Sequence, residues 1–118
     1  MSQRLGKDEK LKSRQVIERL FSEGKSAKKF PVKVIYLPLE DSEKSRAAFA
    51  VPKRSFKLAV SRNRIKRQMR EAYRRHKHLL ITQQPQPYAL LFLYISKEKP
   101  QFAPLSSSIE ALLKKINV

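Results

Sequence analysis

The run Tyr-Ala-Leu-Leu-Phe-Leu-Tyr-Ile-Ser, residues 88–96, sets the architecture of this chain. It is continuously apolar and has the length of a strand, which is typical of a strand buried on both faces. Such a strand lies inside a sheet, so neighbouring strands and covering helices are expected elsewhere in the chain. The run therefore predicts a domain in which helices pack on a sheet.

Two more strands are predicted before this run. In Phe30 to Leu39, two valines and a tyrosine recur at every second position, and Ala47 to Val51 is a second short apolar segment. The polar cluster at residues 41–45 is typical of a turn, so we expect these two strands to form a hairpin. A basic connection follows from Lys53 to Val60, with room for a short strand of its own.

Three helices complete the pattern. The first is predicted from Ser13, a suitable N-cap, to Gly24, a residue type that commonly follows a helix end. The second is predicted over residues 61–80. The last follows a capping box made by Ser107 and Glu110 and carries apolar residues at helical spacing. This order of elements predicts a small α+β domain.

Length and composition set further bounds. A chain of 118 residues with 41% hydrophobic residues suits one domain with a modest core. We expect residues 1–118 to form this single domain, with about the first ten residues flexible. No apolar run approaches the roughly 18 residues that cross a membrane, and the N-terminus lacks the apolar core of a secretory signal. With no cysteine in the chain, we expect a cytoplasmic protein without a membrane partner.

Positive charge is the dominant feature of the composition. The chain holds 27 Lys and Arg against 10 Asp and Glu, a formal net charge of +17. Such self-repulsion usually persists because a polyanion neutralises it. The excess is also local, since Glu71 is the only acid between Lys53 and Lys77. This localisation predicts a docking surface for nucleic acid.

On a helical wheel, residues 61–80 separate into two adjoining faces. The apolar face holds Ile65, Met69, Ala72, Tyr73, His76 and Leu80. The basic face holds Arg62, Lys66, Arg67, Arg70, Arg74 and Lys77. The first face is expected to pack on the sheet and the second to point outward.

A run of charge is often no more than a solvated helix face. Solvated faces usually mix both signs, however, because like charges four residues apart repel. Here Arg62, Lys66, Arg70 and Arg74 are four apart with no acid among them, which favours binding of a polyanion. Arginine pairs bidentately with phosphate and stacks on bases, and Asn63 near the helix start can bond to a base or ribose. RNA is therefore the favoured ligand.

Residues 59–67, Ala-Val-Ser-Arg-Asn-Arg-Ile-Lys-Arg, continuing to Arg70-Glu71, resemble the RNR signature of the bacterial ribonuclease P protein family. The resemblance covers most of the chain, because the predicted elements occur in the order of that family. It implies a small mixed sheet packed with about three helices, similar to the second domain of ribosomal protein S5. It also implies a left-handed β-α-β crossover, against the general preference for right-handed ones.

The resemblance implies an RNA-binding subunit of an endoribonuclease. In the family, a catalytic RNA removes the 5′ leader of precursor tRNA, and the protein binds both the catalytic RNA and the leader. One protein is expected per RNA, with the free protein monomeric. The residues implied to face RNA are Arg62, Asn63, Arg64, Lys66, Arg67 and Arg70, with Lys53 and Arg54 close by.

A cleft between the first helix and the sheet holds the single-stranded leader in this family. The family's pair of aromatic residues on the first helix corresponds here to Ile17 and Phe21, so only Phe21 offers a stacking surface. Packing in the core is an equally good role for Phe21. Tyr36 is a further cleft candidate, although its register relative to Ile35 is open. The stretch 54–58 departs from the family, which usually has a glycine and one residue fewer, so its conformation is also open.

The sequence offers no constellation for catalysis or metal binding by the protein. His76 lies on the apolar face and His78 near the helix end, and neither has metal-ligating partners at suitable spacing. Glu71 is most simply an intrahelical partner of a neighbouring arginine. We therefore expect no catalytic residue and no cofactor on the protein, with Mg²⁺ held by the catalytic RNA.

Two other classes of protein share parts of this pattern. A ribosomal protein with the same small fold would have a similar composition and periodicity, and the RNR run distinguishes the two. A membrane-active or DNA-compacting cationic protein would not need a buried strand or helices with apolar stripes. No helix-turn-helix or zinc-finger spacing supports sequence-specific reading of DNA.

Overall fold

A computed structural model of the chain describes residues 14–39, 45–79 and 87–116. In chain order its elements are α1 (Arg14–Glu23), β1 (Lys25–Lys29), β2 (Val32–Pro38), β3 (Arg46–Ala50), α2 (Ala59–His76), β4 (Tyr88–Tyr94) and α4 (Phe102–Ile116). The strands form one mixed sheet in the order β1-β2-β4-β3. The predicted α+β class is confirmed.

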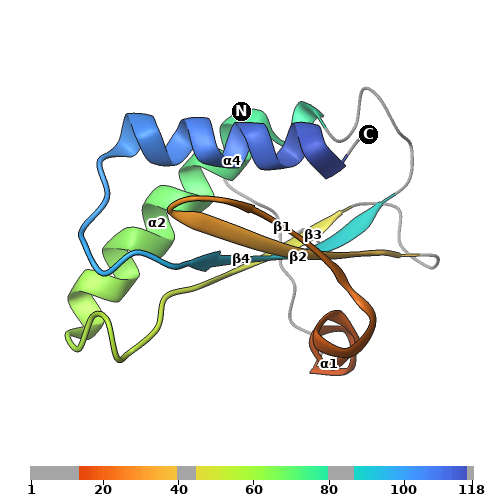
Figure 1. The fold of residues 1–118 in the computed structure, drawn as a ribbon, viewed down its shortest axis with the longest axis horizontal. Helices are drawn as coiled ribbons and strands as arrows, with labels where there is room; N and C mark the ends of the chain where they lie inside the picture. The colour runs from red at the N-terminus through yellow and green to blue at the C-terminus, as the bar shows by residue number, and fades with distance from the viewer. Residues whose placement is uncertain (1–13, 40–44, 80–86, 117–118) are drawn as a thin grey trace, which may run out of the picture.

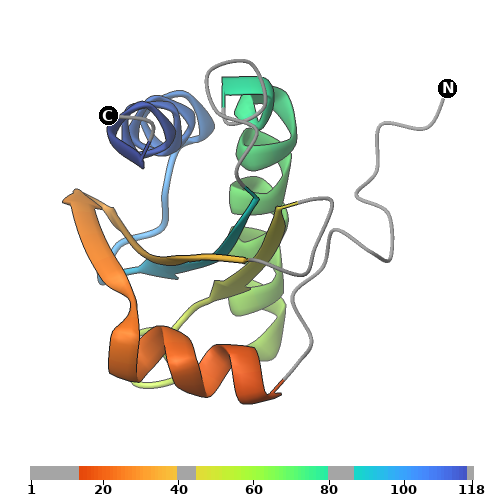
Figure 2. The same cartoon turned by 90° about the vertical axis from the view of Figure 1, so that its right-hand side faces the viewer.

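The helices lie on both faces of the sheet (Figure 1). On the face that we call the upper face, α2 and α4 pack side by side, with α2 towards β3 and α4 towards β1 (Figure 2). The opposite, lower face is crossed by α1 near one end of the strands. Among the described residues the lower face thus has a single helix, while the upper face has two.

The inner strand β4 occupies the position predicted from its apolar run. It pairs antiparallel with β2 and parallel with β3. Leu90, Phe92 and Tyr94 join the upper core, whereas Ala89 and Leu91 join the lower one. Because all five side chains are buried, each face of the sheet must be covered by at least one helix.

The predicted hairpin between the strands at Phe30–Leu39 and Ala47–Val51 is wrong. β2 and β3 are not neighbours, because β4 lies between them. Instead β3, α2 and β4 form a β-α-β unit with parallel strands, and the hand of this crossover stays a prediction. A hairpin exists one strand earlier, where β1 pairs antiparallel with β2. The sequence analysis missed β1 because Lys25–Lys29 consists of three lysines, a serine and an alanine.

The helix bounds differ from the predictions at both ends of α2 and at the start of α4. α2 begins at Ala59 rather than Ser61, and the basic connection before it forms no strand. α4 begins at Phe102, so the predicted capping box is wrong, because Ser107 and Glu110 lie inside the helix. The expected flexible residues 1–10, the N-cap at 13 and most of the turn at 41–45 fall outside the described residues. The predicted end of the second helix at 80 is wrong, because α2 ends at His76 and a turn follows at Lys77.

α2 is anchored through the predicted apolar stripe. Ile65, Met69, Ala72 and Tyr73 are buried in the upper core, and the ring of Tyr73 meets that of Phe49 edge-on with their centres 6.0 Å apart. Full burial of a large apolar side chain contributes about 1.5–3 kcal/mol. This anchoring holds a strongly basic helix on the sheet.

Gly24 joins α1 to β1. A glycine is needed at this position because neighbouring atoms approach it closely, and not because of its backbone angles. Its φ is not positive, so the left-handed conformation common after a helix is not used. A Cβ at this position would overlap the carbonyl oxygen of Leu20 and come within 2.9 Å of Ile35 Cγ2. The Gly24 amide donates a hydrogen bond of 3.0 Å to the same carbonyl. The C-terminal end of α1 can therefore lie this close to Ile35 of β2 because residue 24 has no side chain.

We expect Gly24→Ala to lower the free energy of unfolding by about 1–3 kcal/mol, the usual cost of overpacking. Urea denaturation measures the change. Ser26→Ala, at an exposed position of β1, is the matched control and should stay within about 0.5 kcal/mol of the parent protein. A Gly24→Ala variant as stable as this control would contradict the close approach.

Candidate nucleic-acid interface

The polar and basic residues predicted to face RNA differ in exposure. The exposed ones are Asn63, Arg64, Arg67 and Arg70 on α2, and Lys53 and Arg54 on the turn before it. Lys66 and Arg62 are half-buried. Exposure alone therefore separates the predicted set into two groups, and the contacts of each residue decide what it can bind.

Arg62 turns back to the segment that leads into α2. Its Nη1 donates to the carbonyl oxygens of Phe56 and Lys57, each at 2.8 Å. Leu58 at the helix N-cap makes no side-chain capping bond, so the Arg62 guanidinium organises this segment instead. Arg62 is thus half-buried and supports the fold through Nη1, and its contact with RNA stays a prediction.

The conformation of residues 54–58, which the sequence left open, is a turn closed onto Pro52. The amides of Ser55 and Phe56 both donate to the Pro52 carbonyl, at 3.3 and 3.2 Å. Phe56 is buried in the upper core, where its ring centre lies 5.8 Å from that of Tyr94. Where a glycine would leave this stretch flexible, the buried ring of Phe56 fixes the turn to the core.

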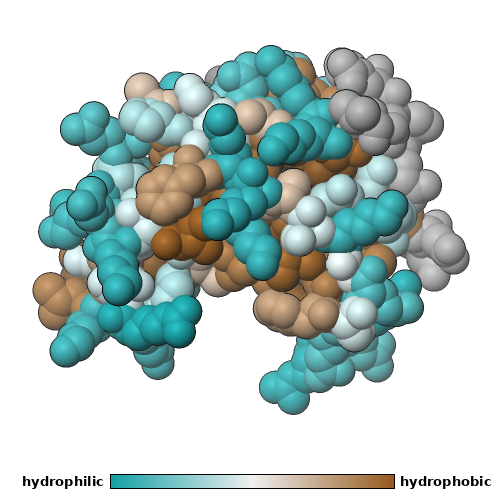
Figure 3. All heavy atoms as spheres, viewed as in Figure 1, coloured by the Kyte–Doolittle hydropathy of each residue, from teal (hydrophilic) through white to brown (hydrophobic). Residues whose placement is uncertain are grey.

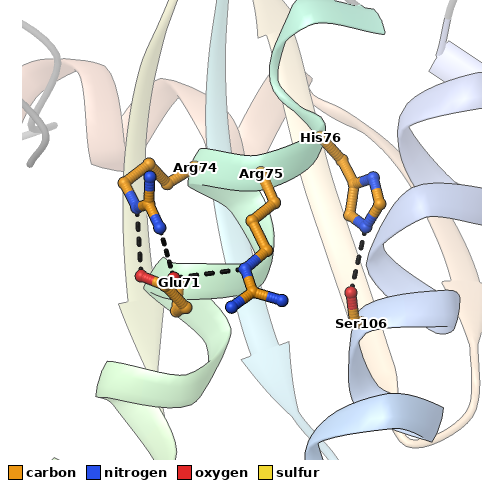
Figure 4. Close-up of polar contacts among 5 residues, drawn as sticks. All are labelled: Glu71, Arg74, Arg75, His76 and Ser106. Carbon is orange, nitrogen blue, oxygen red and sulfur yellow. Dashed lines mark hydrogen bonds and ion pairs between the residues drawn. The ribbon is translucent and has the colours of Figure 1, made fainter. Parts of the chain in front are cut away.

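Glu71 gathers two arginines farther along α2 (Figure 4). Arg74 donates two hydrogen bonds to the Glu71 carboxylate, and Arg75 donates one through Nε at 3.2 Å. The hydrogen bond from Arg74 is the main cause that lowers the pKa of Glu71. The Arg75 guanidinium also lies 4.9 Å from the ring centre of Phe102 on α4. The predicted intrahelical role of Glu71 is confirmed. In this half of α2, the guanidinium groups of Arg74 and Arg75 are therefore engaged in contacts within the domain.

The remaining outward residues form what we call the α2 basic face: Asn63, Arg64, Lys66, Arg67 and Arg70. Within residues 14–39, 45–79 and 87–116, no carboxylate forms an ion pair with any of them. Arg70 is steadied by the ring of Phe49 on β3, whose centre lies 5.8 Å from the guanidinium carbon. The α2 basic face is thus an exposed cationic surface on an anchored helix.

The two histidines are engaged differently. His76 Nε2 lies 2.9 Å from Ser106 Oγ, so this side chain links α2 to α4 (Figure 4), while His78 is exposed. In the part of the chain that the structure describes, no three His, Cys, Asp or Glu residues are grouped to hold a metal ion. No helix in that part is long and apolar enough to span a bilayer.

A second candidate site lies on the lower face beside α1. Leu20 is buried there, and Val16 and Ile17 pack partly against the same apolar cluster. Phe21 is 64% exposed, so its ring is not part of the core. The space-filling view shows the lower side hollowed between α1 and the segment that leads into α2, with apolar surface in the hollow (Figure 3). We call this hollow the α1 cleft.

Tyr36 lies on the opposite face of the sheet from this cleft. Its neighbour Ile35 belongs to the lower core, whereas Tyr36 packs on the upper core. Its ring meets that of Tyr88 edge-on, with centres 6.0 Å apart. The prediction of Tyr36 as a cleft residue is wrong, because the alternation of β2 turns its ring towards α2 and α4.

The strand register adds lower-face residues that the sequence analysis missed. Lys33 of β2 lies directly opposite Leu93 of β4 on one side and Lys28 of β1 on the other. All three share the lower face, because Ile35 does and side chains alternate along each strand. The alternation of Lys33 with two valines was a usable signal. Lys28 had no such signal, because β1 itself was not predicted.

Comparison with known proteins adds independent findings. A family model described as Ribonuclease P matches residues 5–117. The ribonuclease P protein component of Porphyromonas gingivalis is 38% identical over 120 residues, which cover 95% of this chain and 85% of that protein. That of Chlorobium phaeobacteroides is 37% identical over 129 residues, which cover 97% and 88%.

Solved structures show a similar fold. The RNase P protein from Thermotoga maritima matches with a TM-score of 0.75 and 26% identity over 91% of this chain and 96% of that one. The RNase P protein of Staphylococcus aureus has a TM-score of 0.76 over 92% and 94% of the two chains, and at 22% identity it shows the fold alone. The sequence matches favour the ribonuclease P hypothesis over the ribosomal and membrane-active alternatives.

We expect Arg62→Ala to lower the free energy of unfolding by about 1–3 kcal/mol, because hydrogen bonds from a charged donor to the turn are lost. Arg67→Ala is the matched control, since Arg67 is exposed on the same helix. It should change the unfolding free energy by less than about 0.5 kcal/mol. Urea denaturation at one salt concentration compares the two variants, and equal stabilities would contradict a structural role for Arg62.

Proposed function

The chain belongs to the ribonuclease P protein family, and from this membership we propose that its α2 basic face binds the catalytic RNA of the holoenzyme. As a protein component of a ribonuclease, the chain serves the processing of tRNA 5′ leaders and partners with ribonuclease P RNA. The observation that carries the proposal is the exposure of Asn63, Arg64, Arg67 and Arg70 on a helix whose other side is buried.

The charge state of these residues supports binding rather than chemistry. Arginine stays protonated in proteins and offers five donors but no acceptor, so it holds phosphates and does not act as a general base. In this proposal the catalytic RNA, with its Mg²⁺, cleaves the phosphodiester bond, and no protein side chain is catalytic. One protein joins one RNA in the cytoplasm, and the free protein is a monomer.

Among the described residues, no carboxylate is paired with the α2 basic face, which supports tight RNA binding. No ion pair among the described residues has to break before Arg64 or Arg67 meets a phosphate. Lys53 and Arg54, exposed on the preceding turn, extend the same charge. Each phosphate contact releases counterions, so the affinity should fall steeply as salt concentration rises.

The proposal gives the α1 cleft to the single-stranded leader of precursor tRNA. The exposed ring of Phe21 offers a surface on which one base can stack. Ile17 contributes an apolar wall and packs against the sheet. A sequence-tolerant site of this kind suits leaders of many sequences, because every base has a face that can stack.

Reconstitution tests the main proposal. The protein is added to a bacterial ribonuclease P RNA at low Mg²⁺ concentration, and 5′ maturation of a precursor tRNA is followed. We expect stimulation over RNA alone, and we expect Arg64→Ala with Arg67→Ala to raise the dissociation constant for the RNA by about 10- to 100-fold.

The matched control is Lys99→Ala with Lys114→Ala, which removes two exposed charges elsewhere. It should bind nearly as the parent protein does. Absence of stimulation at protein concentrations that saturate RNA binding would refute the proposed function.

Phe21→Ala tests the leader cleft. Loss of one stacked base should raise the dissociation constant for precursor tRNA about ten-fold, with binding of mature tRNA unchanged. Phe21→Tyr should restore the parent affinity, because the aromatic face is kept. Binding of both ligands to the reconstituted holoenzyme is the measurement. Equal losses for precursor and mature tRNA would contradict the assignment of Phe21 to the leader.

A further inference from the structure

Two large apolar side chains at the start of α2 are exposed to solvent. Leu58, at the N-cap, is 71% exposed, and Val60, in the first helical turn, is 70% exposed. They are the most exposed large apolar side chains in the part of the chain that the structure describes. Neither belongs to the two apolar cores, because the buried residues of α2 begin at Ile65. Packing within the free protein therefore explains neither residue.

Leu58 is an unfavourable residue for the N-cap of a helix. N-caps are usually Ser, Thr, Asp or Asn, whose side-chain oxygen accepts a hydrogen bond from an amide of the first turn. Leu58 has the extended backbone of an N-cap, with φ −80° and ψ 128°, but it makes no capping bond. The helix therefore lacks a stabilising contact at this position. Such departures from the local rules are expected where a side chain serves binding.

The backbone that carries Leu58 is nevertheless fixed. The Arg62 amide donates a hydrogen bond of 3.2 Å to the Leu58 carbonyl, and the Arg62 guanidinium holds the carbonyls of Phe56 and Lys57. The buried ring of Phe56 anchors the same turn, which protrudes at one end of the domain (Figure 1). A partner that covers Leu58 thus has little backbone to order, which lowers the entropic cost of binding.

Positive charge surrounds both apolar side chains. Lys57 precedes Leu58 directly, and Val60 shares a helix face with Arg64, which follows it by four residues. The N-terminal end of α2 adds the partial positive charge of the helix dipole. In the described ranges, no carboxylate forms an ion pair with the nearby cations, which are Lys53, Arg54, Lys57 and Arg64. A partner that covers Leu58 and Val60 must therefore combine negative charge with an apolar surface.

RNA fits this description better than a protein partner does. The phosphates of RNA are charged while the face of each base is apolar, and unpaired bases can be unstacked and covered by side chains. The centre of a protein–protein interface is depleted of charged residues. Here cations lie directly beside both apolar side chains, which favours a partner with phosphates at close intervals.

We propose that Leu58 and Val60 are apolar contacts for the catalytic RNA, packing on the face of an unstacked base while the neighbouring cations hold phosphates. The inference rests on the proposed function of the α2 basic face and adds to it a part of the affinity that does not depend on salt. Phosphate contacts set the salt dependence of RNA binding. Loss of an apolar contact therefore weakens binding equally at all salt concentrations.

The main test compares RNA affinity with protein stability. Leu58→Ser removes the apolar side chain and supplies a favourable N-cap. Its urea denaturation midpoint should rise, while its dissociation constant for ribonuclease P RNA increases about ten-fold. Val60→Thr replaces one methyl group by a hydroxyl and should increase the dissociation constant about four-fold, the contribution of one buried methyl group. A purely structural role would lower affinity only together with stability.

Salt titration separates these contacts from the charged ones. Plots of log affinity against log salt concentration for Leu58→Ser and Val60→Thr should run parallel to that of the parent protein. Arg64→Gln with Arg67→Gln should instead reduce the slope by about 1.4–1.8, or about 0.7–0.9 per lost phosphate contact.

Two control variants test the need for an apolar surface at this place. Leu58→Met with Val60→Ile keeps the surface apolar and should bind RNA as the parent protein does. Phe30→Ser removes another exposed apolar side chain, at the turn between β1 and β2, and should also leave RNA affinity unchanged. An equal loss from Phe30→Ser and Leu58→Ser would contradict a specific contact.

Crosslinking identifies what Leu58 touches. The chain has no cysteine, so Leu58→Cys provides a single site for a photoreactive aryl azide. In the reconstituted holoenzyme with precursor tRNA, we expect crosslinks to unpaired nucleotides of the catalytic RNA, mapped by primer extension. Crosslinks to tRNA or to paired nucleotides, or no crosslink to RNA at all, would overturn the inference.

Two further results would overturn the inference and leave the proposed function standing. One is an unchanged RNA affinity of Leu58→Ser and Val60→Thr when the Arg64/Arg67 variant binds more weakly than the parent protein. The other is a loss of stability in Leu58→Ser that accompanies its loss of affinity. If the Arg64/Arg67 variant binds RNA as tightly as the parent protein, the proposed function of the α2 basic face fails, and this inference fails with it.

Discussion

Burial of β4 on both faces constrains the rest of the domain. With Phe92 in the upper core and Leu91 in the lower one, neither face of the sheet can be left in water. Among the described residues, α2 and α4 cover the upper face, and α1 covers one end of the lower face. Beside α1 the lower side is hollowed and shows apolar surface, which is the α1 cleft (Figure 3). The same constraint that builds the core therefore places apolar side chains at the base of this hollow.

The net charge of +17 is compatible with this fold because some basic side chains bond within the domain and others are exposed to solvent. Arg62 holds the turn before α2, and Arg74 and Arg75 share Glu71. The first contact fixes the N-terminal end of α2, and the others offset positive charge near its C-terminal end. Arg64 and Arg67 are exposed and make no ion pair among the described residues. A helix wheel does not separate these groups, because it shows the direction of a side chain from the axis and not what lies at its far end.

Sequence reasoning was strongest where burial dictates the residue type. The apolar run at 88–96 and the stripe of Ile65, Met69 and Tyr73 were placed correctly because no other position suits them. It failed where pairing is non-local. The order β1-β2-β4-β3 depends on which strand meets which, and adjacent strands in sequence favoured a β2–β3 hairpin. Tyr36 was misplaced for a related reason, since Ile35 and Leu37 are also apolar and hide the alternation.

β1 shows how a strand of the sheet can lack any local signal in the sequence. Its five residues would not form a strand on propensity, because lysine, serine and alanine are poor strand formers. Pairing with β2 and the contact of Ala27 with the upper core hold it in place. That tertiary support is what tolerates the repulsion of Lys28 by Lys33 across the ladder.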